Sequence, residues 1–268
     1  SDLSTHANLV GSQTLGLSGT GTIASKNVGS NKTVSIGTLA LADGSNGGLA
    51  ANYTLTGGTH QLTVNQRPLN ATLARQYDAT TTSAGSTLSS FDALQGGENL
   101  TMTGSGTAAS KNVANGITMS SNGNLALADG TGLASNYSLN STVINISKRV
   151  LNSSGSKTYD ANTDALAGAI TLSNFASTET LNHSGTASTS SANAASYTIS
   201  NLTGVSIADG TNGGLASNYT LTGGTHNFTV NRRVVGVSGT RLYDATTNAV
   251  ASDLSTHANL VGSQTLGL

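Results

Sequence analysis

The sequence has no cysteine, no tryptophan, a single proline and few charged residues. Of its 268 residues 9% are charged, and 11 Lys and Arg against 12 Asp and Glu leave a net charge of −1. The lack of cysteine excludes disulfides, thiolate metal sites and cysteine nucleophiles. Binders of nucleic acid or of acidic membranes need clustered positive charge, so both classes are excluded. No run of about 18 apolar residues occurs, so no membrane-spanning helix is predicted.

The chain is instead rich in glycine, with 33 residues, and in Ser, Thr and Asn, and Glu98 and Glu179 are its only glutamates. These abundant residues favour turns and strands over long helices. No segment keeps a 3.6-residue apolar period for three turns, whereas several short stretches alternate apolar and polar residues. The pattern predicts an all-β fold. Strands are expected at Val34–Ala42, Leu100–Met102, Ile117–Met119, Ile170–Leu172, Tyr197–Leu202 and Val234–Val237.

The sequence repeats on two scales. Residues 1–17 recur letter for letter as residues 252–268, an offset of 251. Within that long period, a Tyr-Asp-Ala step and an Asn-Tyr step that follows an Asp-Gly loop each occur three times. These two steps define the repeat, and their residues are Tyr77, Asp78, Tyr159, Asp160, Tyr243 and Asp244 for the first and Asn52, Tyr53, Asn136, Tyr137, Asn218 and Tyr219 for the second. Internal repeats of this kind predict modules of about 80 residues.

Each module is expected to close with an alternating strand that ends in basic residues, at residues 60–67, 142–149 and 226–233. This phase places modules at 1–67 (lacking its own opening strand), 68–149 and 150–233, and residues 234–268 begin a fourth. Because almost no linker separates them, the modules are expected to stack into an elongated rod. A β-solenoid is the alternative, but its coils of roughly 20–30 residues find no matching period here.

Repeats with a basic residue before Tyr-Asp-Ala, Gly-rich strands, and then Asn-Tyr-Thr/Ser-Leu resemble the YDG-type repeats of large bacterial exoproteins of the filamentous-haemagglutinin type. They are also similar to the mostly β-grasp repeats of those proteins. The resemblance implies small β-grasp or Ig-like modules in a surface adhesin, often exported by two-partner secretion. Ala79, Ala161 and Ala245 stand where the family usually has Gly, which is not expected to change the fold. The third module lacks the pair seen at Lys26-Asn27 and Lys111-Asn112.

Both tyrosine sets are interpreted as core residues whose hydroxyls find partners at the module edge. The alternative is a ligand-stacking role for Tyr53, Tyr137 and Tyr219. The Asp-Gly loops offer oxygen atoms for calcium, but each brings a single carboxylate, from Asp43, Asp129 or Asp209. Since calcium takes roughly six to eight oxygens, an Asx-type turn is the favoured interpretation, and no cofactor is expected.

The five histidines do not recur in every module, and no G-x-S-x-G nucleophile elbow is present, so no enzyme is expected. The favoured function is a structural spacer, located outside a bacterial cell or on its surface, that projects an adhesive end and supports adhesion or biofilm formation. Its expected partners are neighbouring repeats, followed by other copies of the fibre, glycans or matrix. The alternative is that the repeats themselves bind glycans or assemble by strand addition between chains.

Overall fold

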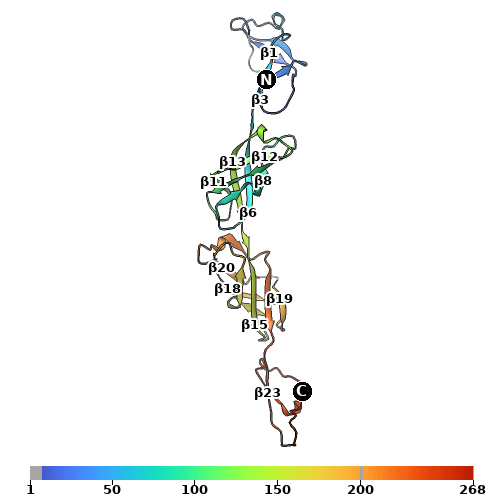
Figure 1. Cartoon of the computed structure of the whole chain (residues 1–268), viewed down its shortest axis with the longest axis vertical. Helices are drawn as coiled ribbons and strands as arrows, with labels where there is room; N and C mark the ends of the chain where they lie inside the picture. The colour runs from blue at the N-terminus through green and yellow to red at the C-terminus, as the bar shows by residue number, and fades with distance from the viewer. Residues whose placement is uncertain (1–7, 200–201, 268) are drawn as a thin grey trace. The chain divides into compact units, whose positions relative to one another are not determined.

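The computed structural model describes residues 8–199 and 202–267 (Figure 1). Within them the fold is all-β, as predicted, because every regular element is a strand or a short 3-10 turn. No helix in this part of the chain is long and apolar enough to cross a membrane. The chain divides into two compact units, one of residues 1–74, 82–109 and 118–144, and the other of residues 75–81, 110–117 and 145–268. The module boundaries stay a prediction. Below, module 1, module 2 and module 3 denote residues 1–67, 68–149 and 150–233.

Module 2 is built on a sheet of six strands in the order β7-β10-β11-β13-β6-β8, so that its first and last long strands, β6 and β13, are neighbours (Figure 1). A separate antiparallel pair joins β9 to β12. In β6, Leu69, Ala71 and Leu73 alternate inward, which is the period-2 pattern of a half-buried strand. The strands are β6 (Arg67–Gln76), β7 (Thr82–Ala84), β8 (Leu88–Phe91), β9 (Leu100–Thr103), β10 (Ser105–Ala108), β11 (Ala114–Ser121), β12 (Ala126–Asp129) and β13 (Tyr137–Ser147).

Module 3 has a four-stranded sheet, β17-β15-β22-β19, and a three-stranded sheet, β16-β18-β20. Its opening strand β15 and closing strand β22 pair in parallel, from Ser153 opposite His226 to Thr158 opposite Asn231. Phe228 and Val230 of β22 point into the core. The strands are β14 (Arg149–Val150), β15 (Asn152–Thr158), β16 (Asp164–Leu166), β17 (Ile170–Ser173), β18 (Leu181–Ser188), β19 (Ala195–Thr198), β20 (Val205–Asp209), β21 (Tyr219–Thr220) and β22 (His226–Asn231).

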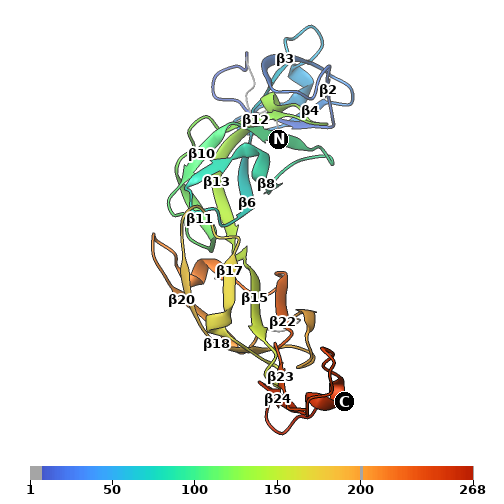
Figure 2. The same ribbon diagram turned by 60° about the horizontal axis from the view of Figure 1, so that its bottom comes forward.

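Module 1 contains the antiparallel pair β1-β4 and the three-stranded sheet β2-β3-β5, and the last stretch of chain contains the antiparallel pair β23-β24 (Figure 2). Within residues 8–199 and 202–267, six 3-10 turns recur at two positions of the repeat. The strands are β1 (Leu15–Ser18), β2 (Thr22–Ile23), β3 (Gly29–Ser35), β4 (Ala40–Asp43), β5 (Gln61–Val64), β23 (Gly236–Ser238) and β24 (Thr256–Ala258). The turns are η1 (Ala50–Asn52), η2 (Gly85–Thr87), η3 (Ala134–Asn136), η4 (Ala167–Ala169), η5 (Ala216–Asn218) and η6 (Ala251–Asp253).

The strand expected over Val34–Ala42 is two strands in the structure. β3 ends at Ser35, and the chain turns before β4 begins at Ala40. Gly37 lies in this turn at φ +57°, a left-handed conformation that glycine adopts without a Cβ clash. Of the strand expected over Tyr197–Leu202, only the first two residues lie in β19, and residues 200–201 lie outside the described residues.

The largest fully buried side chains include Tyr77, Tyr219 and Phe228. In module 2 a cluster of Leu69, Leu100 and Tyr137 gathers partly buried neighbours such as Phe91. The core is thus made of aliphatic residues with a few tyrosines and phenylalanines, and those tyrosines carry the groups described next.

Candidate functional site

The Tyr-Asp-Ala step forms the same turn at each of its three occurrences. The Asp78 carboxylate accepts hydrogen bonds from the Thr80 backbone N–H and hydroxyl, both at 2.9 Å, and pairs with Arg75. Asp244 does the same with Thr246 and Arg241. Asp160 accepts from the Asn162 N–H at 3.1 Å and pairs with Lys157 at 2.8 Å. The aspartate therefore closes a local turn just after the tyrosine.

The alanine of each step takes a left-handed backbone conformation, with φ of 66° at Ala79, 63° at Ala161 and 61° at Ala245. An alanine Cβ is strained there, whereas glycine is not. This explains why a glycine suits this position. The fold keeps the turn with alanine in all three places.

The tyrosine before the turn contributes to a buried polar cluster, which we call the second joint because it connects module 2 to module 3 within the second compact unit. The Tyr77 hydroxyl donates to Glu179 Oε1 at 2.7 Å, and the Tyr219 hydroxyl donates to Glu179 Oε2 at 2.6 Å. Lys111 Nζ lies 3.2 Å from Glu179 Oε1. The Tyr77 and Tyr219 rings meet edge to face with centroids 5.5 Å apart. One carboxylate therefore receives two hydroxyls and one ammonium group, a set of charge-assisted hydrogen bonds.

Burial and hydrogen bonding act in opposite directions on Glu179, whose side chain is 2% exposed. Burial alone raises the pKa of the Glu179 carboxyl, but the hydrogen bonds from Tyr219, Tyr77 and Lys111 outweigh it and hold that pKa below its ordinary value. Burial and then the hydrogen bond to the Glu179 carboxylate raise the pKa of Tyr77 to about 12. The same two causes raise the pKa of Tyr219. At neutral pH the cluster is therefore an ionised carboxylate held by two neutral phenols.

Next to this cluster an asparagine bridges the same two modules. Asn218 is 1% exposed, and its Oδ1 accepts the Val113 backbone N–H at 2.9 Å. Its Nδ2 donates to Asn112 Oδ1 at 3.0 Å. Both polar ends of a buried amide are thus satisfied across the joint. We call this arrangement the asparagine clamp.

The first joint connects modules 1 and 2 within the first compact unit and repeats the same chemistry. Lys26 Nζ lies 2.6 Å from Glu98 Oε1, and the Tyr137 hydroxyl donates to Glu98 Oε2 at 2.7 Å. The Lys26 bond and the Tyr137 bond both lower the pKa of the Glu98 carboxyl. Asn136 forms the clamp, with its Oδ1 2.9 Å from the Val28 N–H and its Nδ2 3.0 Å from Asn27 Oδ1.

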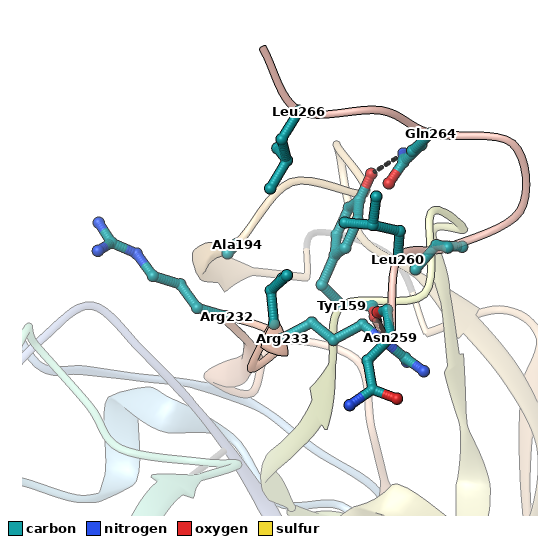
Figure 3. Close-up of a pocket in the computed structure, with 10 residues that line it drawn as sticks. Tyr159, Ala194, Arg232, Arg233, Asn259, Leu260, Gln264 and Leu266 are labelled. Atoms are coloured by element: carbon teal, nitrogen blue, oxygen red, sulfur yellow. Dashed lines mark hydrogen bonds between the residues drawn. The ribbon is translucent and has the colours of Figure 1, made fainter. Parts of the chain in front are cut away.

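The third joint connects module 3 to residues 234–267 and has a different centre. Gln264 stands at the repeat position of Glu98 and Glu179, and its Nε2 donates to the Tyr159 hydroxyl at 2.6 Å (Figure 3). Gln264 and Tyr159 line an open hollow of about 350 Å³ together with Leu260 and Leu266. Arg233 Nε donates to the Asn259 carbonyl at 2.6 Å. The corresponding arginines of the other joints bond in the same way, Arg67 to the Ala93 carbonyl and Arg149 to the Asn174 carbonyl.

The model of the YDG domain family matches residues 1–62 and 61–144, which is more than half of the chain. The chain belongs to the YDG domain family. The resemblance in the sequence is thereby confirmed for the type of repeat. The curated proteins and the solved structures contain no match. In this chain, two tyrosines of the Tyr-Asp-Ala steps have their hydroxyls in a joint. The Tyr77 hydroxyl donates to Glu179 in the second joint, and the Tyr159 hydroxyl accepts from Gln264 in the third.

The Asp-Gly loops of the YDG repeats use their carboxylates to cap a 3-10 turn. Asp43 Oδ1 accepts the Ala50 N–H at 2.7 Å, Asp129 Oδ1 accepts the Ala134 N–H at 2.7 Å, and Asp209 Oδ1 accepts the Ala216 N–H at 2.8 Å. The sequence favours an Asx-type turn, in which the side chain bonds its own backbone two residues on, whereas in the structure the bond spans five or seven residues. Each cap holds a turn that ends in an asparagine, which forms the clamp in the cases of Asn136 and Asn218. In the described part of the chain, no three His, Cys, Asp or Glu side chains lie together as a metal site would need.

The remaining residues that define the YDG repeat lie at the ends of the series. Tyr53 is half-buried, and its hydroxyl donates to Gln13 Oε1 at 2.5 Å. Asn52, at the clamp position, is exposed. Tyr243 is 94% exposed, although its aspartate makes the usual turn. The third module keeps the asparagine of the Lys-Asn pair as Asn193, whose backbone N–H donates to the Ser191 hydroxyl oxygen as its equivalents do with their serines, so Ala192 replaces the lysine alone.

Sequence reasoning missed Glu98 and Glu179 as site residues. The signal was available, because the only two glutamates of the chain are 81 residues apart, close to the module length, and two of the five lysines are 85 apart at Lys26 and Lys111. Because only 9% of the residues are charged, charged residues that recur at about one module length indicate a structural role in the repeat. Chemically, a carboxylate saturated by two hydroxyls and an ammonium group holds two segments of chain together.

Proposed function

We propose that these YDG repeats are structural spacers of a long extracellular fibre of the bacterial adhesin type, which holds an adhesive end away from the cell. The observation that carries this proposal is the joint. Lysine–glutamate and asparagine contacts recur where module 1 meets module 2 and where module 2 meets module 3. The proposal assigns no catalysis, metal or cofactor to the chain.

The physics of the joints supports a spacer. Each joint uses residues of adjacent modules only, so an array can be lengthened by adding modules without changing the fold. Several hydrogen bonds at separate points of a joint oppose both bending and twisting between neighbours. A low charge and a surface of hydroxyls and amides suit a protein that meets salt, sugars and matrix outside the cell. The absence of cysteine also agrees with the habit of many bacterial surface proteins.

A distance measurement across the second joint tests the stiffness that a spacer needs. Because the chain has no cysteine, Ser90→Cys and Thr171→Cys give two unique spin-label sites, both on exposed residues. We expect a single narrow distance distribution, as narrow as that of a control pair within module 3, Thr171→Cys and Ser184→Cys. A distribution much broader than that of the control would overturn the proposal.

Electron microscopy of the native full-length protein tests the larger claim. A spacer predicts module-sized beads in single file along each molecule, at a spacing of roughly 30–45 Å for folded modules of this size. A helical assembly in which modules of several chains contact each other would instead make the repeats the cohesive element, and the spacer proposal would fail.

A further inference from the structure

One pair of positions distinguishes the third joint from the first two. The first joint pairs Lys26 with Glu98, and the second pairs Lys111 with Glu179. At the third joint the lysine position holds Ala192 and the glutamate position holds Gln264. Both members of the pair change together, so each joint is either charged on both sides or neutral on both sides.

Hydrogen-bond chemistry explains why the two members change together. A carboxylate can only accept, and Glu179 accepts from two tyrosines while Lys111 balances its buried charge. An amide accepts through its oxygen and donates through its nitrogen. Gln13 and Gln264 occupy the same position of the 251-residue period, and they show these two functions separately.

Gln13 Oε1 accepts from the Tyr53 hydroxyl of its own module, and Gln264 Nε2 donates to the Tyr159 hydroxyl of the preceding module. A glutamine at this position can therefore bridge two tyrosines with no cation nearby. A glutamate in the same place is a buried negative charge that needs one.

We propose that this pair is a matching code that decides which module can stack on which. A module with lysine at the position of Lys26 and Lys111 (a lysine end) accepts a following module with glutamate at the position of Glu98 and Glu179 (a glutamate module). A module with alanine there, as at Ala192 (an alanine end), accepts a following module with glutamine, as at Gln264 (a glutamine module). The two mismatches differ in cost. A glutamate module on the Ala192 end would bury a carboxylate without an ammonium partner, which is severe. A module with glutamine at the Glu98 or Glu179 position, stacked on a lysine end, would only leave an ammonium group unpaired that water reaches, since the Lys26 side chain is 80% and the Lys111 side chain 37% exposed.

The other cations of the third joint are already engaged or point away. Arg233 bonds the carbonyls of Asn259 and Tyr159. Arg232 extends away from Gln264 and Tyr159 (Figure 3). Neighbouring modules of similar sequence tend to pair wrongly while a repeat protein folds. A code in which the worst mismatch is a buried uncompensated charge would disfavour such pairings. It rests on the joints alone and holds whatever the array projects.

A double-mutant cycle in the full chain tests the code. The variants are Lys111→Ala, Glu179→Gln and both together, and the measurement is hydrogen exchange of the Val113 amide, which the clamp protects across the second joint. We expect Lys111→Ala to speed exchange roughly tenfold or more, because it leaves Glu179 buried without a cation. We expect Glu179→Gln to have a smaller effect, and the double variant to exchange within about threefold of the wild type, because the pair is coupled.

The matched control is Lys157→Ala with Asp160→Asn, an ion pair inside module 3 that should leave the Val113 amide unchanged. Effects of Lys111→Ala and Glu179→Gln that simply multiply in the double variant would refute the code. The reverse transplant keeps the test decisive if a variant at the second joint fails to fold. Gln264→Glu should speed exchange over residues 259–266, and adding Ala192→Lys should restore protection. Failure of that rescue would also refute the code.

Discussion

The asparagine clamp of the second joint gives the sharpest test of how the modules are held together. Replacing Asn218 by alanine removes the acceptor for the Val113 N–H and the donor to Asn112 Oδ1, at 2.9 and 3.0 Å. The side chain is 1% exposed, so solvent does not reach its place directly. The variant keeps the backbone of η5 and the neighbouring Tyr219, and the change is therefore local to the clamp.

The expected cost follows from the two bonds. A hydrogen bond that is lost while its partner stays buried costs about 1–3 kcal/mol. Val113 and Asn112 are half-buried, so water can partly satisfy the groups that are left behind. We therefore expect the joint to open more easily by about 2 kcal/mol in total. This corresponds to roughly a thirtyfold faster exchange of the Val113 amide, since each 1.4 kcal/mol is a factor of ten.

The assay is hydrogen exchange of the full chain, and the control is Asn52→Ala. Asn52 occupies the same repeat position but is exposed, and among the described residues its side chain has no hydrogen-bond partner. Its replacement should change stability by less than about 0.5 kcal/mol, as surface substitutions usually do. Equal effects of the two substitutions would refute the clamp as the source of the protection.

Three further outcomes are expected. Ala161→Gly should stabilise module 3 by about 0.5–1 kcal/mol in chemical denaturation, because glycine takes φ 63° without strain, while the same change at Ala165 in β16 should destabilise it; a loss at Ala161 would contradict this. Asp209→Ala should cost about 1 kcal/mol by removing the cap, and added calcium should leave the melting temperature of the wild type unchanged; a rise that the variant abolishes would make the loop a calcium site. The folded pKa of Glu179 lies below its ordinary value of 4.5, so its contribution to the stability of the second joint is complete above that pH and is lost as the pH falls through the lowered pKa. The spin-label distance distribution across the second joint should therefore broaden in acid. Glu179→Gln should remove this pH dependence.

The sequence predicted the all-β class and the repeat because both depend on short-range patterns. Alternation in stretches such as residues 142–149 is local, and the repeat is visible as identity of letters. The turn after each tyrosine was also predictable in kind, since an Asp followed two residues later by a backbone N–H is a common local motif. The two-strand division at Gly37 was missed because a tight turn inside an apolar stretch leaves little trace in the pattern.

The joint could not be read from the sequence in the same way. Tyr77 and Glu179 are 102 residues apart, and Lys111 and Glu179 are 68 apart, so no local rule connects them. Residue spacing suggested only that the tyrosines and lysines recur. Which group faces which depends on how the end of one module meets the start of the next, and only coordinates supply that.

The positions of the repeated polar residues in the modules explain why these residues recur together. Tyr77 lies at the end of its module that meets the following module, whereas Tyr137 serves the joint with the preceding one. Within module 2 the two tyrosines therefore serve different joints: in an isolated module the Tyr77 hydroxyl would lose Glu179, whereas the Tyr137 hydroxyl would keep Glu98. A buried carboxylate such as Glu179 is also costly unless tyrosines from two modules and a lysine surround it. The Tyr77, Lys111 and Asn218 side chains thus find polar partners in a neighbouring module, so these contacts form in the array and not in a single module.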